Sequence, residues 1–174
     1  SADGIRVAVA VSKDLKTIAE ELAKRLNKII VSSSDVAGFI GNGYIMREIL
    51  YACQKAKEFG NIHVDAEGIC LINTITKDFL LRPMGIFQLI DYIGIDVCQR
   101  ILKVMRQELK DETLHEVWID QMLLHGKKGG QTADGKQMPG FFEYDGLIPK
   151  AVYSFQEKNY IPIDEIMKRV RENI

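Results

Sequence analysis

Three glycines and one amide side chain lie together between a short apolar run and a long amphipathic stretch. They are Gly38, Gly41, Asn42 and Gly43. Glycines that precede a helix let its backbone approach a phosphate group. An asparagine amide can instead hold a carbonyl oxygen or an imidazole without adding charge. The two chemistries open to these residues are therefore nucleotide binding and hydrogen bonding to a substrate.

The order of the glycines disfavours nucleotide binding. The dinucleotide fingerprint is G-x-G-x-x-G, followed by a second strand and an acidic residue about 20 positions on. Here the order is G-x-x-G-x-G, and the residues that follow have helical periodicity. We therefore expect the glycines to let a helix start pack closely against another backbone. For Asn42 two interpretations stay open, a substrate contact and a simple helix cap.

The other reactive side chains have no catalytic or metal-ligand spacing. The three cysteines lie in apolar-periodic runs, as buried reduced thiols do. The histidines share no ligand spacing with them, so no metal site is predicted. We also expect none of the histidines to be catalytic, because roles near helix ends suffice for two of them. These residues are Cys53, Cys70 and Cys98, and His63, His115 and His125.

Composition places the chain among ordinary globular proteins. It has 174 residues, of which 47% are hydrophobic and 27% charged, and its formal net charge is -1. This suits one domain or one domain and a fragment, and gives no reason to expect nucleic acid as a partner. No apolar run reaches the roughly 20 residues that cross a bilayer, so no membrane partner is expected. Reduced cysteines and the absence of a secretory segment favour a cytoplasmic protein.

Hydrophobic periodicity predicts a mainly helical chain behind a short α/β opening. Residues 5–11 and 28–31 resemble strands on either side of a helix that begins near Ser12, as at the end of a parallel α/β sheet. Such an opening suggests that the chain is cut from something larger. Helices are then expected over residues 44–59, after Asp65, over residues 86–93 and 96–109, from a capping box at residues 113–116 as far as Gly126, and from Ile163. The tail from Leu147 is expected to be a packing extension.

Three stretches resemble the 3-hydroxyacyl-CoA dehydrogenases. Residues 35–42, D-V-A-G-F-I-G-N, are similar to the family segment D-x-P-G-F-[IV]-x-N-R, where an NAD domain meets a helical C-terminal domain. Residues 82–96, R-P-M-G-I-F-Q-L-I-D-Y-I-G-I-D, are similar without gaps to P-M-G-P-F-x-L-x-D-x-x-G-x-D. Residues 129–144 resemble the closing G-K-K-T-G-x-G-F-Y-x-Y, with an insertion between Gly130 and Pro139.

The resemblance implies a fold and an activity. Residues 35–174 would form a helical domain of the 6-phosphogluconate dehydrogenase C-terminal-like type, behind a stub of a Rossmann domain at residues 1–34. The implied enzyme of fatty-acid β-oxidation reversibly oxidises a 3-hydroxyacyl-CoA to the 3-oxo form with NAD. This chain would supply walls of the acyl-CoA pocket and the interface of a homodimer. The family's catalytic histidine and glutamate precede the matched residues, so the chain alone is predicted to be inactive.

The resemblance also implies which residues form the site. Asn42 falls on the motif asparagine, which would hydrogen-bond near the substrate's 3-oxygen and the catalytic histidine. Pro83, Met84, Gly85 and Phe87 would wall the acyl-thioester pocket and exclude water. Ordinary turn and core packing is the alternative for these four residues. No residue of this chain is expected to bind the cofactor.

Three departures from the family motifs leave a second hypothesis open. Ala37 replaces a proline, Gly43 replaces the arginine after the asparagine, and Ile86 replaces a second proline. Losing the arginine removes an anchor with several hydrogen-bond donors. The alternative is a non-catalytic helical association module, in which the apolar stripes over residues 98–109 and 117–123 pair with a second copy instead of filling the core. A 6-phosphogluconate-type dehydrogenase is disfavoured by the P-M-G-x-F-x-L-x-D run.

Overall fold

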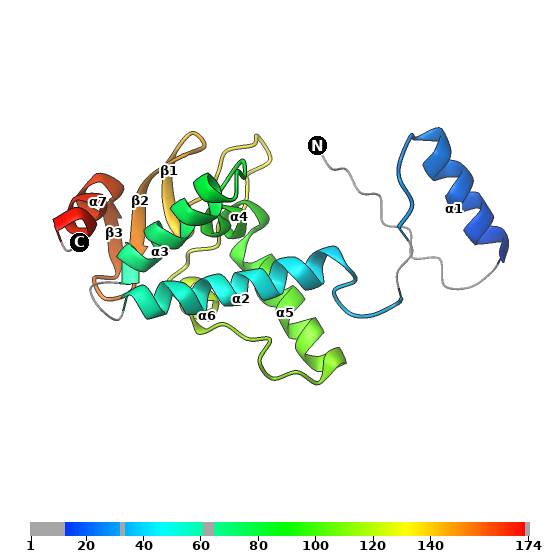
Figure 1. The fold of residues 1–174 in the computed structure, drawn as a ribbon, viewed down its shortest axis with the longest axis horizontal. Helices are drawn as coiled ribbons and strands as arrows, with labels where there is room; N and C mark the ends of the chain where they lie inside the picture. The colour runs from blue at the N-terminus through cyan, green and yellow to red at the C-terminus, as the bar shows by residue number, and fades with distance from the viewer. Residues whose placement is uncertain (1–12, 32–33, 61–64, 173–174) are drawn as a thin grey trace.

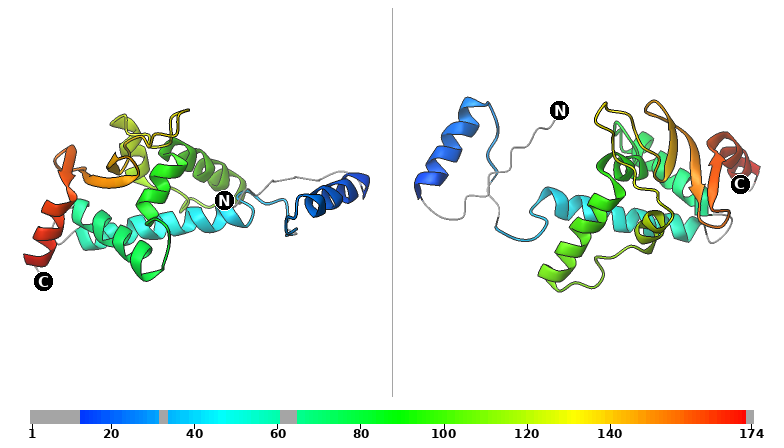
Figure 2. Two further views of the ribbon diagram at one scale, coloured as in Figure 1. Left: turned by 90° about the horizontal axis from the view of Figure 1, so that it is seen from above. Right: turned by 180° about the vertical axis from the view of Figure 1, so that it is seen from behind.

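The fold is a helical body with a small sheet at its C-terminal end. The computed structural model describes residues 13–31, 34–60 and 65–172. In these residues there are seven α-helices, one π-helical turn and one three-stranded sheet, so the prediction of a mainly helical chain is confirmed. Helix α1 (Lys13–Arg25) stands apart from the other elements in all three views (Figures 1 and 2).

The predicted α/β opening is confirmed only in its helix. The helix expected after Ser12 is α1, which ends at Arg25. It is followed by a turn in which Asn27 has a left-handed φ of 52°, as is common after a helix. Residues 5–11 lie outside the described residues. The strand predicted over residues 28–31 is wrong, because this segment is irregular, with Ile29 93% exposed. A run of β-branched residues does not form a strand without a neighbouring strand to pair with.

Helices α2 (Gly41–Gly60) and α3 (Asp65–Thr74) form an antiparallel pair, with α3 running back along α2 (Figure 1). Their backbones approach closely at Gly68, where an added Cβ would lie 2.0 Å from the carbonyl oxygen of Ala56. A side chain at position 68 would therefore push the two helices apart.

The chain then turns at the predicted break and forms two further helices. α3 continues into the π-helical turn η1 (Ile75–Phe79). After residues 80–85 come α4 (Ile86–Ile93) and α5 (Ile95–Leu109), separated by Gly94 with a φ of 100°. Both helices were predicted, but α5 begins at Ile95 after a glycine cap and not at a capping box from Asp96.

Helix α6 (Val117–Leu124) is capped by a buried acid. The Glu116 carboxylate accepts a hydrogen bond from Trp118 N at 2.9 Å. It also forms an ion pair with Lys57 of α2. The Lys57 ammonium also lies 5.1 Å from the centre of the Trp118 ring. These contacts attach the start of α6 to the C-terminal end of α2.

The tail is a sheet, which sequence reasoning missed. Strands β1 (Phe142–Asp145), β2 (Ile148–Ser154) and β3 (Asn159–Pro162) are antiparallel in the order β1-β2-β3, and α7 (Ile163–Glu172) follows. Among the described residues, the sheet therefore lies near the C-terminal end. Its first turn is built on Gly146, whose φ of 61° suits a hairpin.

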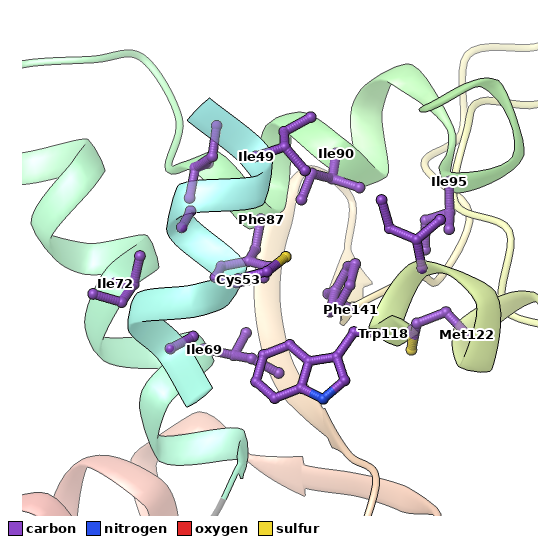
Figure 3. Packing of buried hydrophobic residues seen from close by; sticks show 14 of the residues in the cluster. Ile49, Cys53, Ile69, Ile72, Phe87, Ile90, Ile95, Trp118, Met122 and Phe141 are labelled. Carbon is purple, nitrogen blue, oxygen red and sulfur yellow. The ribbon is translucent and has the colours of Figure 1, made fainter. Parts of the chain in front are cut away.

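The core joins the helices to one face of the sheet. In the register of the sheet, Phe142 faces Val152, which faces Ile161, and all three are buried. Buried side chains from α2, α3, α4, α5 and α6 fill the interior (Figure 3), among them Ile49, Cys53, Ile69, Ile72, Phe87, Ile90, Ile95, Trp118 and Met122. The three cysteines are buried and unbonded, as predicted. No described helix is both long enough and apolar enough to cross a membrane.

Replacing Gly68 with alanine is expected to lower the free energy of unfolding by about 3 kcal/mol, because the new Cβ collides with backbone. Urea unfolding is followed by the fluorescence of Trp118, the one tryptophan of the chain and only 8% exposed. The control is Gly43→Ala, where the nearest atom is 3.9 Å away, and a gain of up to about 1 kcal/mol is expected. Equal stability of Gly68→Ala and the wild type would contradict the close approach of α2 and α3.

Candidate functional site

Asn42 is the second residue of α2 and follows a tight turn. Gly38 and Phe39 have left-handed φ values of 88° and 44°, and Gly43 N donates to Gly38 O at 2.9 Å. An added Cβ on Gly38 would lie 2.8 Å from Met105 Sδ of α5. The close packing predicted for these glycines is therefore present at Gly38, but its nearest neighbour is a side chain, whereas a backbone was expected. It does not hold at Gly41, which faces open space.

The Asn42 side chain is half-buried and has no hydrogen-bond partner among the described residues. It shares a face of α2 with Met46 and Ile49, which enter the core. Within the described part of the chain its amide makes no hydrogen bond, so it does not act as a helix cap. Ile40, just before α2, and Tyr44, on another face of the helix, expose much of their apolar surface. A free amide beside exposed apolar groups is a suitable place for a ligand or another protein surface.

The turn at residues 83–85 is built around an asparagine of α3. Asn73 Oδ1 accepts from Phe87 N and Gln88 N, both at 3.1 Å, and Asn73 Nδ2 donates to Gln88 Oε1 at 3.1 Å. These bonds cap the start of α4 from another helix. A Cβ on Gly85 would lie 2.3 Å from two oxygens of Asn73. Position 85 therefore needs glycine for packing, whatever else this turn does.

The four predicted wall residues differ in their access to solvent. Phe87 is fully buried, with its ring centre 5.0 Å from that of Phe141. Gly85 is also buried, whereas Met84 is half-buried and Pro83 is exposed. Core packing explains Phe87, and only Pro83 and Met84 present a side chain at the surface. The pocket-wall role of this segment stays a prediction.

An ion pair joins the two predicted parts of the site. Arg82, just before the turn, pairs with Glu48 of α2. Glu48 lies six residues beyond Asn42, which is roughly 9 Å along the helix axis. The turn therefore lies beside the first half of α2, but Glu48 and Asn42 are about 120° apart around that helix, on different faces. Two pockets of about 220 and 230 Å³ occur elsewhere, and neither is lined by Asn42 or by residues 83–87.

Asp91 is a buried acid whose role sequence reasoning missed. Its Oδ1 accepts from Phe141 N at 2.7 Å, and its Oδ2 accepts from Phe142 N at 2.9 Å and from Tyr144 Oη at 2.8 Å. The second and third family-like stretches are thus bound to each other through one carboxylate. An acid inside the apolar stripe of α4 was the available signal, since a buried acid needs partners.

The backbone of Asp91 holds the glycine loop as well. Its carbonyl oxygen accepts from Gly130 N at 2.6 Å and from Gln137 Nε2 at 3.1 Å. A Cβ on Gly140 would lie 2.1 Å from Asp91 Oδ1. Both ends of the insertion are therefore fixed to α4, while its tip at residues 133–136 is exposed. The tip is therefore a solvated loop.

The pKa values of Asp91 and of its partner Tyr144 are both raised, with different consequences. Burial raises the pKa of Asp91 to about 7, and the hydrogen bonds from Phe142, Phe141 and Tyr144 act in the opposite direction. Burial and the neighbouring Asp91 raise the pKa of Tyr144, so its hydroxyl stays protonated and donates. Asp91 is therefore poised to change charge near neutral pH.

The described histidines have local partners. His115 Nε2 lies 2.7 Å from Asp120 Oδ2, and His125 Nδ1 lies 2.9 Å from Tyr153 Oη. His63 lies outside the described residues. In the part of the chain that the structure covers, no three histidine, cysteine or acidic side chains are grouped to hold a metal ion.

Comparison with known proteins gives one family. The family model for the 3-hydroxyacyl-CoA dehydrogenase, C-terminal domain, matches residues 38–137. A probable 3-hydroxybutyryl-CoA dehydrogenase of Deinococcus radiodurans is 30% identical over 134 residues, which are 76% of this chain and 44% of that protein. A Bacillus subtilis protein of the same description is 26% identical over 144 residues, which are 79% and 44%. The chain spans less than half the length of these relatives.

Solved structures show the same likeness. The crystal structure of FadB2 from M. tuberculosis has a TM-score of 0.58 and 25% identity, over 71% of this chain and 42% of that chain. The (S)-3-hydroxybutyryl-CoA dehydrogenase PaaH1 from Ralstonia eutropha has a TM-score of 0.57 and 23% identity, over 68% and 40%. The second structure shows a shared fold alone.

Replacing Asp91 with asparagine is expected to lower the free energy of unfolding by about 1–3 kcal/mol. At pH 5 the Asp91 carboxyl is mostly protonated, and both of its oxygens can still accept a hydrogen bond. The amide nitrogen of asparagine accepts none, so one buried N–H is left unpaired. Urea unfolding at pH 5 measures the change. Tyr144→Phe removes only one donor, and about 1 kcal/mol is expected for it.

The Asp91 carboxyl is also expected to make stability depend on pH. Folding raises the pKa of this carboxyl group. Its stabilising contribution to the free energy of unfolding is therefore fully present below about pH 4 and is lost as the pH rises through about 7. In that window the folded chain binds more protons than the unfolded chain, and the slope is about 1.4 kcal/mol per pH unit. The stability advantage of the wild type over Asp91→Asn should therefore shrink between pH 5 and pH 8. A constant difference would contradict the raised pKa.

Proposed function

The chain belongs to the 3-hydroxyacyl-CoA dehydrogenase C-terminal domain family, and from this we propose that it is the substrate-binding and dimerisation part of an NAD-dependent 3-hydroxyacyl-CoA dehydrogenase. In this proposal residues 35–174 form that domain and residues 1–34 belong to the NAD-binding domain before it. The reaction reversibly converts the 3-hydroxyl group of a 3-hydroxyacyl-CoA to a 3-oxo group, with hydride passing to NAD and a proton released.

The free amide of Asn42 carries the functional part of the proposal. It lies at the start of α2, in the segment that resembles the family's domain junction, and none of its donors or acceptors is used by the described chain. Its N–H would donate to the substrate's 3-oxygen, on which negative charge changes during the reaction. A preorganised neutral donor at that atom stabilises the transition state without holding a charge in an apolar site.

The described residues do not fit NAD itself. A dinucleotide needs a glycine turn between a strand and a helix, with open space for the pyrophosphate. Here residues 28–31 form no strand, and the space next to Gly38 is filled by Met105. The cofactor supplies the hydride acceptor, and in this proposal it is bound by residues other than the described ones.

A homodimer is proposed from the exposed apolar surface beside α2. Tyr44 and Tyr51 lie on one face of α2 and are 77% and 61% exposed. The Arg82–Glu48 pair brings the end of η1 to this face, where Leu81 is 90% exposed. A surface of this kind supports association with a second subunit.

The alternative, a non-catalytic association module, would pair the apolar stripes of α5 and α6 with a second copy and leave Asn42 without a ligand. Those stripes are buried within this chain, so they are not free to pair with another subunit. Their buried residues are Cys98, Leu102 and Met105 of α5 and Ile119 and Met122 of α6.

Replacing Asn42 with alanine in the full-length enzyme is expected to lower kcat for 3-hydroxybutyryl-CoA by a factor equivalent to about 2–4 kcal/mol. The cause is loss of a donor that acts mainly in the transition state. Steady-state NADH formation measures kcat and KM separately. The control is Gln107→Ala, which removes an exposed amide of α5 and should leave both values unchanged. An unchanged kcat in Asn42→Ala would remove this residue from the site.

The 174 residues alone are expected to catalyse no NADH-dependent reduction of acetoacetyl-CoA, because the acid–base pair implied by the family is not among the matched residues. NADH absorbance in the presence of the purified chain is the measurement, with the full-length enzyme as the positive control. Turnover by the isolated chain would contradict the proposed division of labour between the two domains.

A further inference from the structure

A pocket of about 230 Å³ lies between α5 and the segment that enters α6, and we call it the α5–α6 pocket. The chain turns back after α5 to reach this place (Figure 1). Leu102, Leu114 and Ile119 form an apolar floor, each at most 3% exposed. The rim is polar and charged, and is formed by Gln99, Lys103, Arg106, His115, Glu116 and Asp120.

The acidic groups of the rim are neutralised from within the protein. Asp120 accepts from Gln99 Nε2 at 2.6 Å and is paired with His115 Nε2 at 2.7 Å. Partial burial raises the pKa of Asp120, but these two hydrogen bonds and nearby positive charge outweigh it and hold that pKa below its usual value. Glu116 is buried and bound to Lys57 and to Trp118 N. Neither acid has unpaired charge to offer a cationic ligand.

The basic groups of the rim are not neutralised in this way. Lys103 has no hydrogen bond or ion pair within the described residues. The Arg106 guanidinium makes no side-chain hydrogen bond within the described residues. Its Nε lies 3.8 Å from Glu112 Oε2, whose side chain is 87% exposed, and its charge also acts on Asp120 without a direct ion pair. Because Lys103 and Arg106 are three residues apart, they lie on one face of α5, beside the pocket. The side-chain N–H groups of Lys103 and Arg106 are therefore available to donate hydrogen bonds to a ligand in the pocket.

We propose that the α5–α6 pocket binds a small organic anion, with its carboxylate or phosphate group held by Arg106 and Lys103. The planar guanidinium can bind two oxygens of such a group at once. The hydrocarbon part of the ligand lies on Leu102, Leu114 and Ile119. His115, oriented by Asp120, closes the opposite side. The site is separate from Asn42 and does not depend on the proposed dehydrogenase activity.

The direct test is an NMR titration of the ¹⁵N-labelled chain with butyrate, acetate and inorganic phosphate, at ionic strength matched with chloride. Saturable shifts are expected in the amides of residues 99–106 and 114–120. Butyrate should bind roughly tenfold more tightly than acetate, because its two further methylene groups reach the apolar floor. Saturation by phosphate alone would assign the site to phosphate groups. Shifts that do not saturate with any probe, or that map elsewhere, would overturn the proposal.

Two arginine variants separate this site from general charge attraction. Arg106→Ala is expected to weaken binding by tenfold or more. Arg100→Ala removes the same charge from α5, but Arg100 is exposed, pairs with Asp96 at 3.0 Å and does not line the pocket, so binding should be unchanged. Equal weakening in both variants would overturn the proposal. Lys103→Ala gives a second measurement, and Trp118 fluorescence confirms that each variant is folded.

Discussion

The buried carboxylate of Asp91 is the interaction on which the rest of the domain depends. A carboxyl group without water is costly unless donors surround it, and here two backbone amides and one phenol do so. Those donors belong to Phe141, Phe142 and Tyr144, which begin the sheet. The position of β1 against α4 is therefore set by one side chain. Strands β2 and β3 and helix α7 follow from that position through the antiparallel register.

Much of the family-like sequence is architectural in this structure. In the second stretch, Gly85 makes room for Asn73, Phe87 packs against Phe141, and Asp91 binds the third stretch. In the first stretch, Gly38 makes room for Met105. Asn42 differs from all of these, because no described contact explains its amide. The contrast between explained and unexplained residues is the physical reason to place chemistry at Asn42 and packing elsewhere.

Sequence periodicity predicted most helices because an amphipathic helix needs only local information. The stripes of α2, α4, α5 and α7 were visible in the residues themselves. Strands depend on distant partners, so residues 28–31 were assigned wrongly and β1, β2 and β3 were missed. The Asp145-Gly146 pair was the one local sign of the hairpin. The network of Asp91 joins residues about 50 positions apart, and the α5–α6 pocket depends on how the chain turns back after α5. Periodicity contains no information about either.

The loop between Gly130 and Gln137 has a consequence for protein engineering. Its two ends are attached to the same carbonyl oxygen of Asp91, while its tip is exposed. The position of the chain before Gly130 and after Gln137 therefore does not depend on the residues between them. Lengthening a closed loop adds only about 0.6 kcal/mol of entropy per doubling. Residues 133–136 are therefore a suitable insertion site for an epitope or a fluorescent label, because an insertion there leaves the rest of the domain unchanged.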